Sequence, residues 1–309
     1  MAESIVTRRD ALCSIGTFFT MMGCSPEDPS TRDNSVPNMP NEFKAVVNSL
    51  KPWRKQHIRK AYRPITQASK SMEGISRFGG IPLLGPTNDW PSCGRCSRPM
   101  SLLLQLDLAA IPASKAPLDS GVLQVFYCTR MDFDTNEFCD DYQPFSSCHH
   151  LRVISDSQMS PPVGANPVLT FPPVDIVGWE SFDDFPSGEE HDRLGLRYDY
   201  EFRPGFTSVG VHWDDGNVHF TDIVCTNDAG GDLAGEIASA SPKDKLLGWP
   251  MWIQGVEYPS CPRCKREMEY FFQLDSEDNV PHMFGDVGCG HVSYCPDHPD
   301  VLAFTWACS

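Results

Sequence analysis

Paired cysteines occur twice in this chain, and two residues separate the members of each pair. Cys93 and Cys96 form the first pair, and Cys261 and Cys264 form the second. A C-x-x-C turn presents two thiolates on one tight loop, which suits one edge of a tetrahedral zinc site. The spacing therefore predicts two metal-binding turns, each of which needs two further ligands from elsewhere in the chain.

The further ligands are predicted from the segments that follow each pair. Cys128 ends the sequence Val-Phe-Tyr-Cys, and Cys295 ends Val-Ser-Tyr-Cys at almost the same distance after its own pair. We expect site one to consist of Cys93, Cys96, Cys128 and Cys139, and site two to consist of Cys261, Cys264, Cys295 and His298. Each set is a closed four-ligand site of the structural kind, with no position left for water.

Other residues compete for the fourth ligand position of each site. The alternatives to Cys139 are Cys148, His149 and His150, and the alternatives to His298 are Cys289 and Cys308. In an oxidising compartment the cysteines would instead form disulfides. A redox-active dithiol would need a lowered thiol pKa, as at a helix N-terminus. The first pair follows Trp-Pro and runs into Pro99, so no helix start is evident there, and the spacing favours zinc.

The cysteine pairs lie within a longer segment that occurs twice. Pro82 and Asp107 of the first copy align without a gap with Pro250 and Asp275 of the second, and both copies contain Pro-Ser-Cys-x-x-Cys and Gln-Leu-Asp. A repeat of this length indicates a duplicated half-domain rather than a short solenoid unit. We expect one domain over residues 42–309, made of pseudo-repeats 73–155 and 244–309 and a middle segment, 156–243.

Short strands and turns are expected to position the ligands. Proline and glycine are frequent, with 27 and 23 residues, which favours turns over long helices. Residues 100–108 and 121–128 read as buried strands, and an Asp-Gly turn at 215–216 predicts a hairpin. Residues 42–66 have a basic, helical pattern. The expected fold class is α+β: a β-rich, internally duplicated fold with two zinc-knuckle insertions.

The first residues follow the order of an export signal. An Arg8-Arg9 pair precedes an apolar run over residues 11–22, which is too short to span a bilayer. Gly23-Cys24 resembles a lipobox, so Cys24 is predicted to be the lipidated first residue of the mature protein. Residues 1–24 would be the signal and 25–41 a polar tether. This predicts a lipid-anchored or periplasmic protein of the cell envelope, and a cytoplasmic location if residues 1–24 are an ordinary N-terminus.

The charge of the chain restricts its partners. The formal net charge is −16 and the pI is about 4.9, a field that repels phosphate backbones and argues against nucleic-acid binding. The same field speeds the encounter with a basic protein. The expected binding surface is the acidic run that contains Trp179, Asp183, Asp184, Glu189 and Glu190. A solvated loop is the alternative reading of that run.

Several motifs resemble those of the bacterial YwqG-like family. They are Ser-Arg-Phe-Gly-Gly at 76–80, Leu-Gln-Leu-Asp at 104–107, Lys-Leu-Leu-Gly-Trp-Pro at 245–250 and Phe-Gln-Leu-Asp at 272–275. The resemblance covers residues 73–309 and is to the members that keep both cysteine pairs. It extends to eukaryotic zinc proteins of the programmed-cell-death type, which escort a new ribosomal protein. It implies immunity against a neighbour's toxin or the holding of a client protein.

Three hypotheses for function follow. The first is a zinc-stapled module that binds a protein partner, with a basic partner favoured by charge. The second is a metal-dependent envelope enzyme, which needs an open coordination position or a third metal. Its candidate extra ligands are His191, His212, His219 and His282. The third is a structural lipoprotein in which zinc replaces part of the core.

Overall fold

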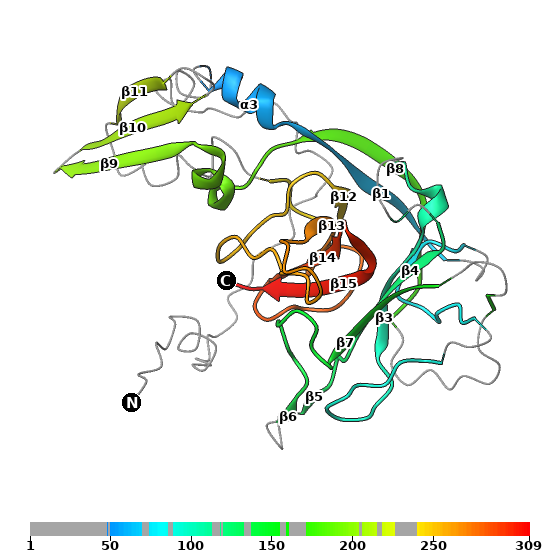
Figure 1. Ribbon diagram of the computed structural model, residues 1–309. Coiled ribbons are helices and arrows are strands. Elements are labelled where there is room, and N and C mark those ends of the chain that lie inside the picture. The colour runs from blue at the N-terminus through cyan, green and yellow to red at the C-terminus, as the bar shows by residue number, and fades with distance from the viewer. Residues whose placement is uncertain are drawn as a thin grey trace, which may run out of the picture. The chain divides into compact units, whose positions relative to one another are not determined.

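A computed structural model of the chain describes a β-rich protein (Figure 1). The described residues are 48, 50–69, 74–85, 89–112, 118, 120–132, 137–154, 159–160, 171–203, 206–214, 218–225 and 240–309. The chain divides into two compact units, Met1–Met39 and Pro40–Ser309, and all described residues belong to the second. The predicted signal, the lipidation site Cys24 and the tether lie outside the described residues. Among the helices that the structure does describe, none is long and apolar enough to span a membrane.

Strands form most of the regular structure. The main sheet contains β1 (Arg59–Ala68), β2 (Arg77–Phe78), β3 (Ser101–Asp107), β4 (Val122–Tyr127), β7 (His149–Ile154), β8 (Val174–Asp184), β12 (Lys245–Leu247), β13 (Glu269–Asp275), β14 (Cys289–Cys295) and β15 (His298–Ala307). A second sheet contains β9 (Arg197–Arg203), β10 (Phe206–Asp214) and β11 (Val218–Cys225), and β5 (Met131–Asp132) pairs with β6 (Glu137–Phe138). The helical elements are α3 (Lys51–His57) and the 3-10 turns η2 (Leu108–Ala110), η4 (Gly188–Glu190) and η5 (Asp192–Leu194). The fold is therefore β-rich, and a single described α-helix does not support the expected α+β class.

The main sheet is antiparallel and nearly closes on itself. Its strand order is β15-β14-β13-β12-β1-β8-β2-β3-β4-β7. The two edge strands, β15 and β7, approach each other, and the rings of Phe304 and His149 lie 5.6 Å apart across the gap. Near closure covers edges that would otherwise offer unpaired backbone groups to other chains.

The order of the strands interlocks two segments of the chain. The strands β2, β3, β4 and β7 form one half of the sheet, and β12, β13, β14 and β15 form the other. The strand that precedes each half in the sequence pairs with the other half. β1 precedes β2 but lies beside β12, and β8 precedes β12 but lies beside β2. β1 and β8 also pair with each other along ten residue pairs. Each half of the sheet therefore depends on a strand from the other part of the sequence.

The two faces of the sheet have different cores. Leu104 of β3, Phe272 of β13 and Phe304 of β15 belong to the main core that the curved sheet encloses. Two smaller clusters are separate from this main core. Leu102 packs with the first cysteine group, and Met268 packs with the second. The cysteine groups therefore take the place of apolar side chains on the face away from the main core.

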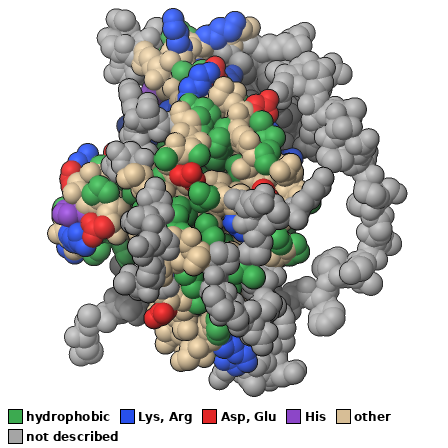
Figure 2. Space-filling model, turned by 90° about the vertical axis from the view of Figure 1, so that its right-hand side faces the viewer, with side chains coloured by type: hydrophobic (Ala, Val, Ile, Leu, Met, Phe, Trp, Pro, Cys, Tyr) green, Lys and Arg blue, Asp and Glu red, His purple; other side chains and the backbone are tan. Residues whose placement is uncertain are grey.

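The central strands carry exposed apolar side chains. A bulge between β1 and β8 leaves Val177 without a register partner, and this side chain is 53% exposed. Ile65 of β1 is 49% exposed. Figure 2 shows the side of the molecule that lies at the right in Figure 1, where apolar side chains gather with few charged groups among them.

The helical expectation for residues 42–66 is correct only in part. α3 covers Lys51–His57, but Arg59–Ala68 is a strand with partners on both sides. Pro64 disfavours a helix interior, and Ile65 and Thr66 are β-branched, so the local sequence suits a strand. The predicted hairpin is confirmed as β10 and β11, but its register places His212 opposite Phe220 rather than opposite His219.

Candidate metal centres

The first cysteine turn is fixed by backbone hydrogen bonds. The N–H of Cys93 donates to Arg98 O at 2.8 Å, and the N–H of Ser97 donates to Cys93 O at 2.8 Å. Gly94 donates its N–H to Ser147 O at 2.9 Å, and a Cβ at Gly94 would lie 2.7 Å from Ser147 Cβ. Glycine is therefore required at this point of the turn, because the segment that leads into β7 passes directly against it.

The second cysteine turn repeats this geometry. The N–H of Cys261 donates to Arg266 O at 2.8 Å, and that of Lys265 donates to Cys261 O at 2.9 Å. Lys265 has a φ of 63°, and Ser97 of the first turn has a φ of 58°, so both turns close through the left-handed region. The same backbone path therefore presents two sulfur atoms in each half of the sheet.

Buried glutamines next to the turns also make equivalent contacts in the two halves. Gln105 Oε1 accepts a hydrogen bond from Leu83 N at 3.0 Å, and Gln273 Oε1 accepts one from Met251 N at 2.8 Å. Each glutamine donates from Nε2 to a backbone carbonyl. These polar groups are fully buried, so their complete pairing is needed for the strands to stay packed.

Two strands complete each group of ligands. Cys128 follows β4 and Cys139 follows β6, which brings both to the first turn. Cys295 ends β14 and His298 begins β15, so the second group closes across a tight turn between neighbouring strands. The ligand atoms of each group lie within 4.8 Å of one another. Both groups could therefore hold a metal ion.

The distances within the groups match a tetrahedral ion. A zinc site with ordinary bond lengths has S···S edges of about 3.8 Å and S···N edges of about 3.6 Å. Cys96 Sγ lies 3.6 Å from Cys128 Sγ, and Cys264 Sγ lies 3.6 Å from Cys295 Sγ. His298 Nδ1 lies 3.8 Å from Cys261 Sγ and 3.6 Å from Cys295 Sγ. These four distances therefore agree with the edges of a four-coordinate site to within a few tenths of an ångström.

The first cysteine of each pair is the one prepared to ionise. Burial raises the pKa of Cys93, but N–H donors from Cys96 and Arg95 outweigh it and bring this pKa down to about 7. Burial likewise opposes ionisation of Cys261, and backbone N–H groups bring its pKa down to about 6. Burial raises the pKa of Cys128 to about 12. One thiolate per group is thus favoured by the protein alone, and ionisation of Cys128 needs a bound cation.

A family model matches residues 76–297 of the chain and is described as a domain of unknown function, DUF1963. The match covers most of the chain. The chain belongs to the DUF1963 family. A comparison with curated proteins found no match. The match agrees with the YwqG-like resemblance of the motifs, and of the eight residues in the two groups of donors it contains all except His298.

The competing ligands lie outside the two groups. Cys148 Sγ is 3.9 Å from Cys93 Sγ, but it is not among the four atoms that are mutually close. His149 Nε2 lies 2.9 Å from the carbonyl of Gln143, and His150 is exposed. Cys289 and Cys308 are buried away from the second group. The two groups of mutually close donors thus contain Cys139 and His298 rather than their competitors.

The histidines considered for a catalytic metal are in separate surroundings. His191 Nδ1 and Tyr198 Oη lie 2.9 Å apart, and His212 Nε2 lies 2.6 Å from Asp199 Oδ2. His282 is buried among aromatic rings. The side chain of His219 lies outside the description. In the described ranges, these histidines do not join any group of three or more metal-ligand side chains.

The acidic run is divided between surface and interior. Asp183 and Glu189 are exposed, and Trp179 packs partly against the main core. Asp184 is buried and accepts hydrogen bonds from Lys245 Nζ and Trp249 N, both at 2.8 Å. Glu190 is 2% exposed and accepts a hydrogen bond from Trp252 Nε1 at 2.8 Å. Asp184 and Glu190 are therefore structural and are not available to a partner.

Proposed function

We propose that this protein is a zinc-stapled protein-binding module built from two duplicated half-domains. The observation that carries the proposal is the pair of four-donor groups at equivalent places in the two halves. Each group offers four protein ligands, so a bound ion would have no open position for a substrate or water. The metal would therefore act on stability, and function would reside on the surface that it holds in place.

Zinc is the metal that this donor chemistry favours. Thiolate and imidazole ligands in a tetrahedral arrangement are typical of zinc, whereas calcium and magnesium prefer oxygen. Disulfides would pair sulfur atoms two at a time, and they would leave His298 without a role. Four converging donors in each half support the metal reading better.

The energetic weight of the two ions would be large. A structural zinc ion contributes on the order of 10 kcal/mol to the folding of a small module. A whole domain is typically stable by about 5–15 kcal/mol. Because the cysteine groups replace apolar packing on the outer face of the sheet, loss of metal would expose a poorly packed surface there.

The proposed partner is a basic protein or segment. The net charge of −16 would speed its approach, and exposed carboxylates at Glu180, Asp183 and Glu189 offer a place for it on β8 and the turn that follows. A basic toxin to be neutralised and a basic client to be held are the two versions that the family resemblance suggests.

Capture by the native, metal-loaded protein tests this partner. The proposal predicts recovery of basic proteins at low salt, with recovery falling as salt rises. A variant with Glu180→Gln, Asp183→Asn and Glu189→Gln should recover less, whereas Glu277→Gln, which changes an exposed carboxylate between β13 and β14, should not. Capture that is absent, or that ignores both salt and the triple change, would contradict a charge-driven partner.

We also propose that the protein is anchored in the cell envelope through Cys24, with no other contact with the membrane. The support is the sequence alone: an Arg-Arg pair, an apolar run and Gly-Cys in that order. Mass spectrometry of the mature N-terminus tests it. A lipid-modified Cys24 is expected, and an intact Met1 in a cytoplasmic fraction would overturn it.

A further inference from the structure

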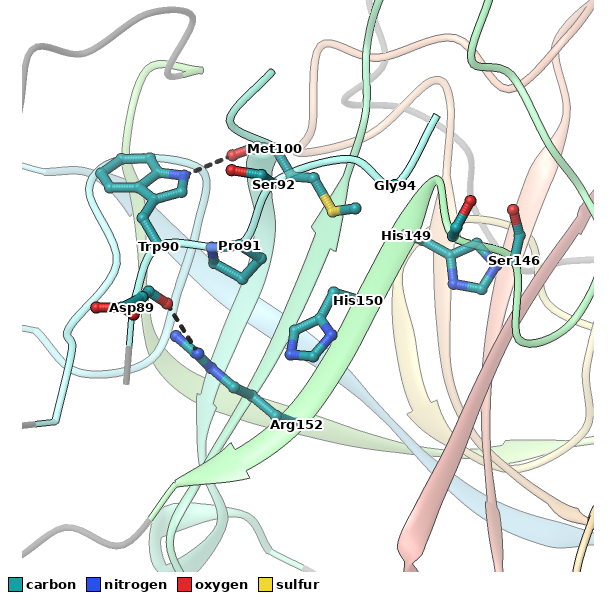
Figure 3. Close-up of a pocket in the computed structure, with 11 residues that line it drawn as sticks. Asp89, Trp90, Pro91, Ser92, Gly94, Met100, Ser146, His149, His150 and Arg152 are labelled. Atoms are coloured by element: carbon teal, nitrogen blue, oxygen red, sulfur yellow. Dashed lines mark hydrogen bonds between the residues drawn. The ribbon is translucent and has the colours of Figure 1, made fainter. Parts of the chain in front are cut away.

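A cavity of about 610 Å³ lies beside the first cysteine group. The first cysteine turn forms one wall with Trp90 and Pro91, and Met100 continues that wall toward β3. His150 and Arg152 line the other wall from the edge strand β7 (Figure 3). The cavity thus combines an apolar wall with a basic one, and Asp89 adds one carboxylate to its lining.

Arg152 is held in position by its neighbours. Its Nε donates to Gln124 Oε1 at 2.9 Å, and its Nη1 donates to the backbone carbonyl of Asp89 at 3.0 Å (Figure 3). The guanidinium lies 5.2 Å from the ring centre of Phe126. Gln124 is itself fully buried and donates to Gln105 Oε1 at 2.8 Å. A buried polar network therefore fixes where this positive charge lies.

Arg152 forms no contact ion pair with a carboxylate among the described residues, although the charge of Asp89, which also lines the cavity, acts on it. Its Nη2 is buried and has no hydrogen-bond partner, and in the described part of the chain no acidic side chain is within ion-pair distance of it. A half-buried cation without a carboxylate in contact is costly. In the same protein, the buried Lys245 is paired with Asp184. A bound anion would remove the cost at Arg152.

The other half of the sheet shows that the fold does not require this arginine. Gln105 of β3 is the register partner of Gln124 on β4, and Gln124 is the register partner of Arg152 on the edge strand β7. At the equivalent register, Gln273 faces His291, which faces Thr305. There the ring of Trp252 lies 4.7 Å from His291. The second half thus fills this place with packed rings and a small hydroxyl, so the basic cavity is a particular feature of the first half.

We propose that the cavity binds a carboxylate that is joined to an apolar group. Arg152 would pair with the carboxylate beside His150, and Trp90, Pro91 and Met100 would contact the apolar part. Because Nη2 is buried, the guanidinium must shift slightly to meet the ligand. The carboxylate could belong to a small organic acid or to the C-terminus of a peptide. This site is distinct from the proposed surface for a basic partner, since it selects an anion.

Isothermal titration of the metal-loaded full chain tests the site with four probes. They are N-acetyl-L-phenylalanine, its amide, inorganic phosphate and a pentapeptide that ends in phenylalanine with a free carboxylate. The acid or the peptide should bind at least 10-fold more tightly than the amide and than phosphate. Tighter binding of the peptide would identify a chain terminus, and tighter binding of the free acid would identify a small molecule.

Variants show whether Arg152 is responsible. Arg152→Gln should weaken binding at least 10-fold, and Arg152→Lys should retain part of it because the charge remains. Arg263→Gln, which changes the equivalent exposed arginine of the second half that pairs with Asp300, should bind as wild type. Zinc content and melting temperature would confirm that each variant is folded. Equal binding of acid and amide, undiminished binding by Arg152→Gln, or no binding of any carboxylate probe would overturn the proposal.

Discussion

Two cysteines of the first half compete for one ligand position, and their surroundings differ. Cys139 belongs to the group of four close donors, whereas Cys148 approaches only Cys93, at 3.9 Å. Cys139→Ala should therefore lower the zinc content by about one ion per chain. Cys148→Ala, an equally buried cysteine in the same cluster, should keep both ions and cost only its packing. The opposite result would assign Cys148 as the ligand.

A buried histidine should make the protein sensitive to acid. Burial lowers the pKa of His282 to about 4, while an unfolded histidine has a pKa of about 6.5. Between these values the unfolded chain binds the proton and the folded chain does not, so stability falls as the pH falls through this window.

Replacing His282 tests this dependence. Its ring lies among Tyr127 and Phe284, and no hydrogen bond is lost at Nε2, so His282→Phe should be close to neutral at pH 7. At pH 4.5 the variant should be more stable than wild type by about 1–3 kcal/mol. Denaturant unfolding at several pH values measures the difference in stability between the variant and wild type. Effects of pH on the metal sites are common to both proteins and cancel in this difference. Parallel loss of stability in both proteins would refute the role of His282.

At the residue scale, sequence spacing was enough to predict which donors come together, but not which carboxylates of the acidic run are buried. The cysteines can be recognised in the sequence because a metal site needs several donors at fixed spacing. Asp184 gave no comparable signal, since its lysine partner lies 61 positions further along the chain. Only the pairing of β1 with both β8 and β12 brings Asp184 and Lys245 together, and so the sequence alone could not separate this buried carboxylate from the exposed Asp183.

Adjacent carboxylates at the end of β8 allow a direct comparison at the scale of elements. Asp184 and Lys245 form a fully buried ion pair that joins β8 to β12, whereas Asp183 and Lys60 pair in solvent. Asp184→Asn leaves a buried ammonium without its counter-ion and should cost about 3–5 kcal/mol. Asp183→Asn should cost about 0–1 kcal/mol. Denaturant unfolding would measure both, and equal costs would contradict the structural role of Asp184.

The strand β1 marks the limit of local patterns for predicting elements. Its basic and apolar residues match a helical period, and α3 directly before it is helical as expected. The β conformation, which Pro64, Ile65 and Thr66 favour locally, is completed by pairing with β8 and β12, which are distant in sequence. The strands β3 and β4 were predicted because they are buried along nearly their whole length and therefore read as apolar runs.

At the scale of the molecule, the exchange of β1 and β8 between the halves predicts mutual dependence. A chain divided between β7 and β8, near residue 165, would separate strands that pair with each other. In one fragment β2 would lack its partner β8, and in the other β12 would lack its partner β1. Neither fragment should unfold cooperatively alone, and mixing them with zinc should restore a cooperative transition. Circular dichroism during thermal unfolding would show this. Independent folding of either fragment would contradict the interlocked topology.

The sequence repeat predicted two related halves but not their exchange of strands. The aligned motifs lie within β2–β4 and β12–β14, and the strands that cross between the halves carry no recognisable copy. Pairing of distant strands depends on the whole chain, so it could not be deduced from motifs.

Metal content is the most direct test of the central claim that two metal ions hold the two halves. Elemental mass spectrometry of protein purified from its native compartment, combined with counting of reactive thiols, would measure it. We predict about two zinc ions per chain, seven cysteines shielded by them, and unfolding when a chelator removes the metal. Protein without bound metal, with the cysteines of both groups oxidised to disulfides, would contradict the account.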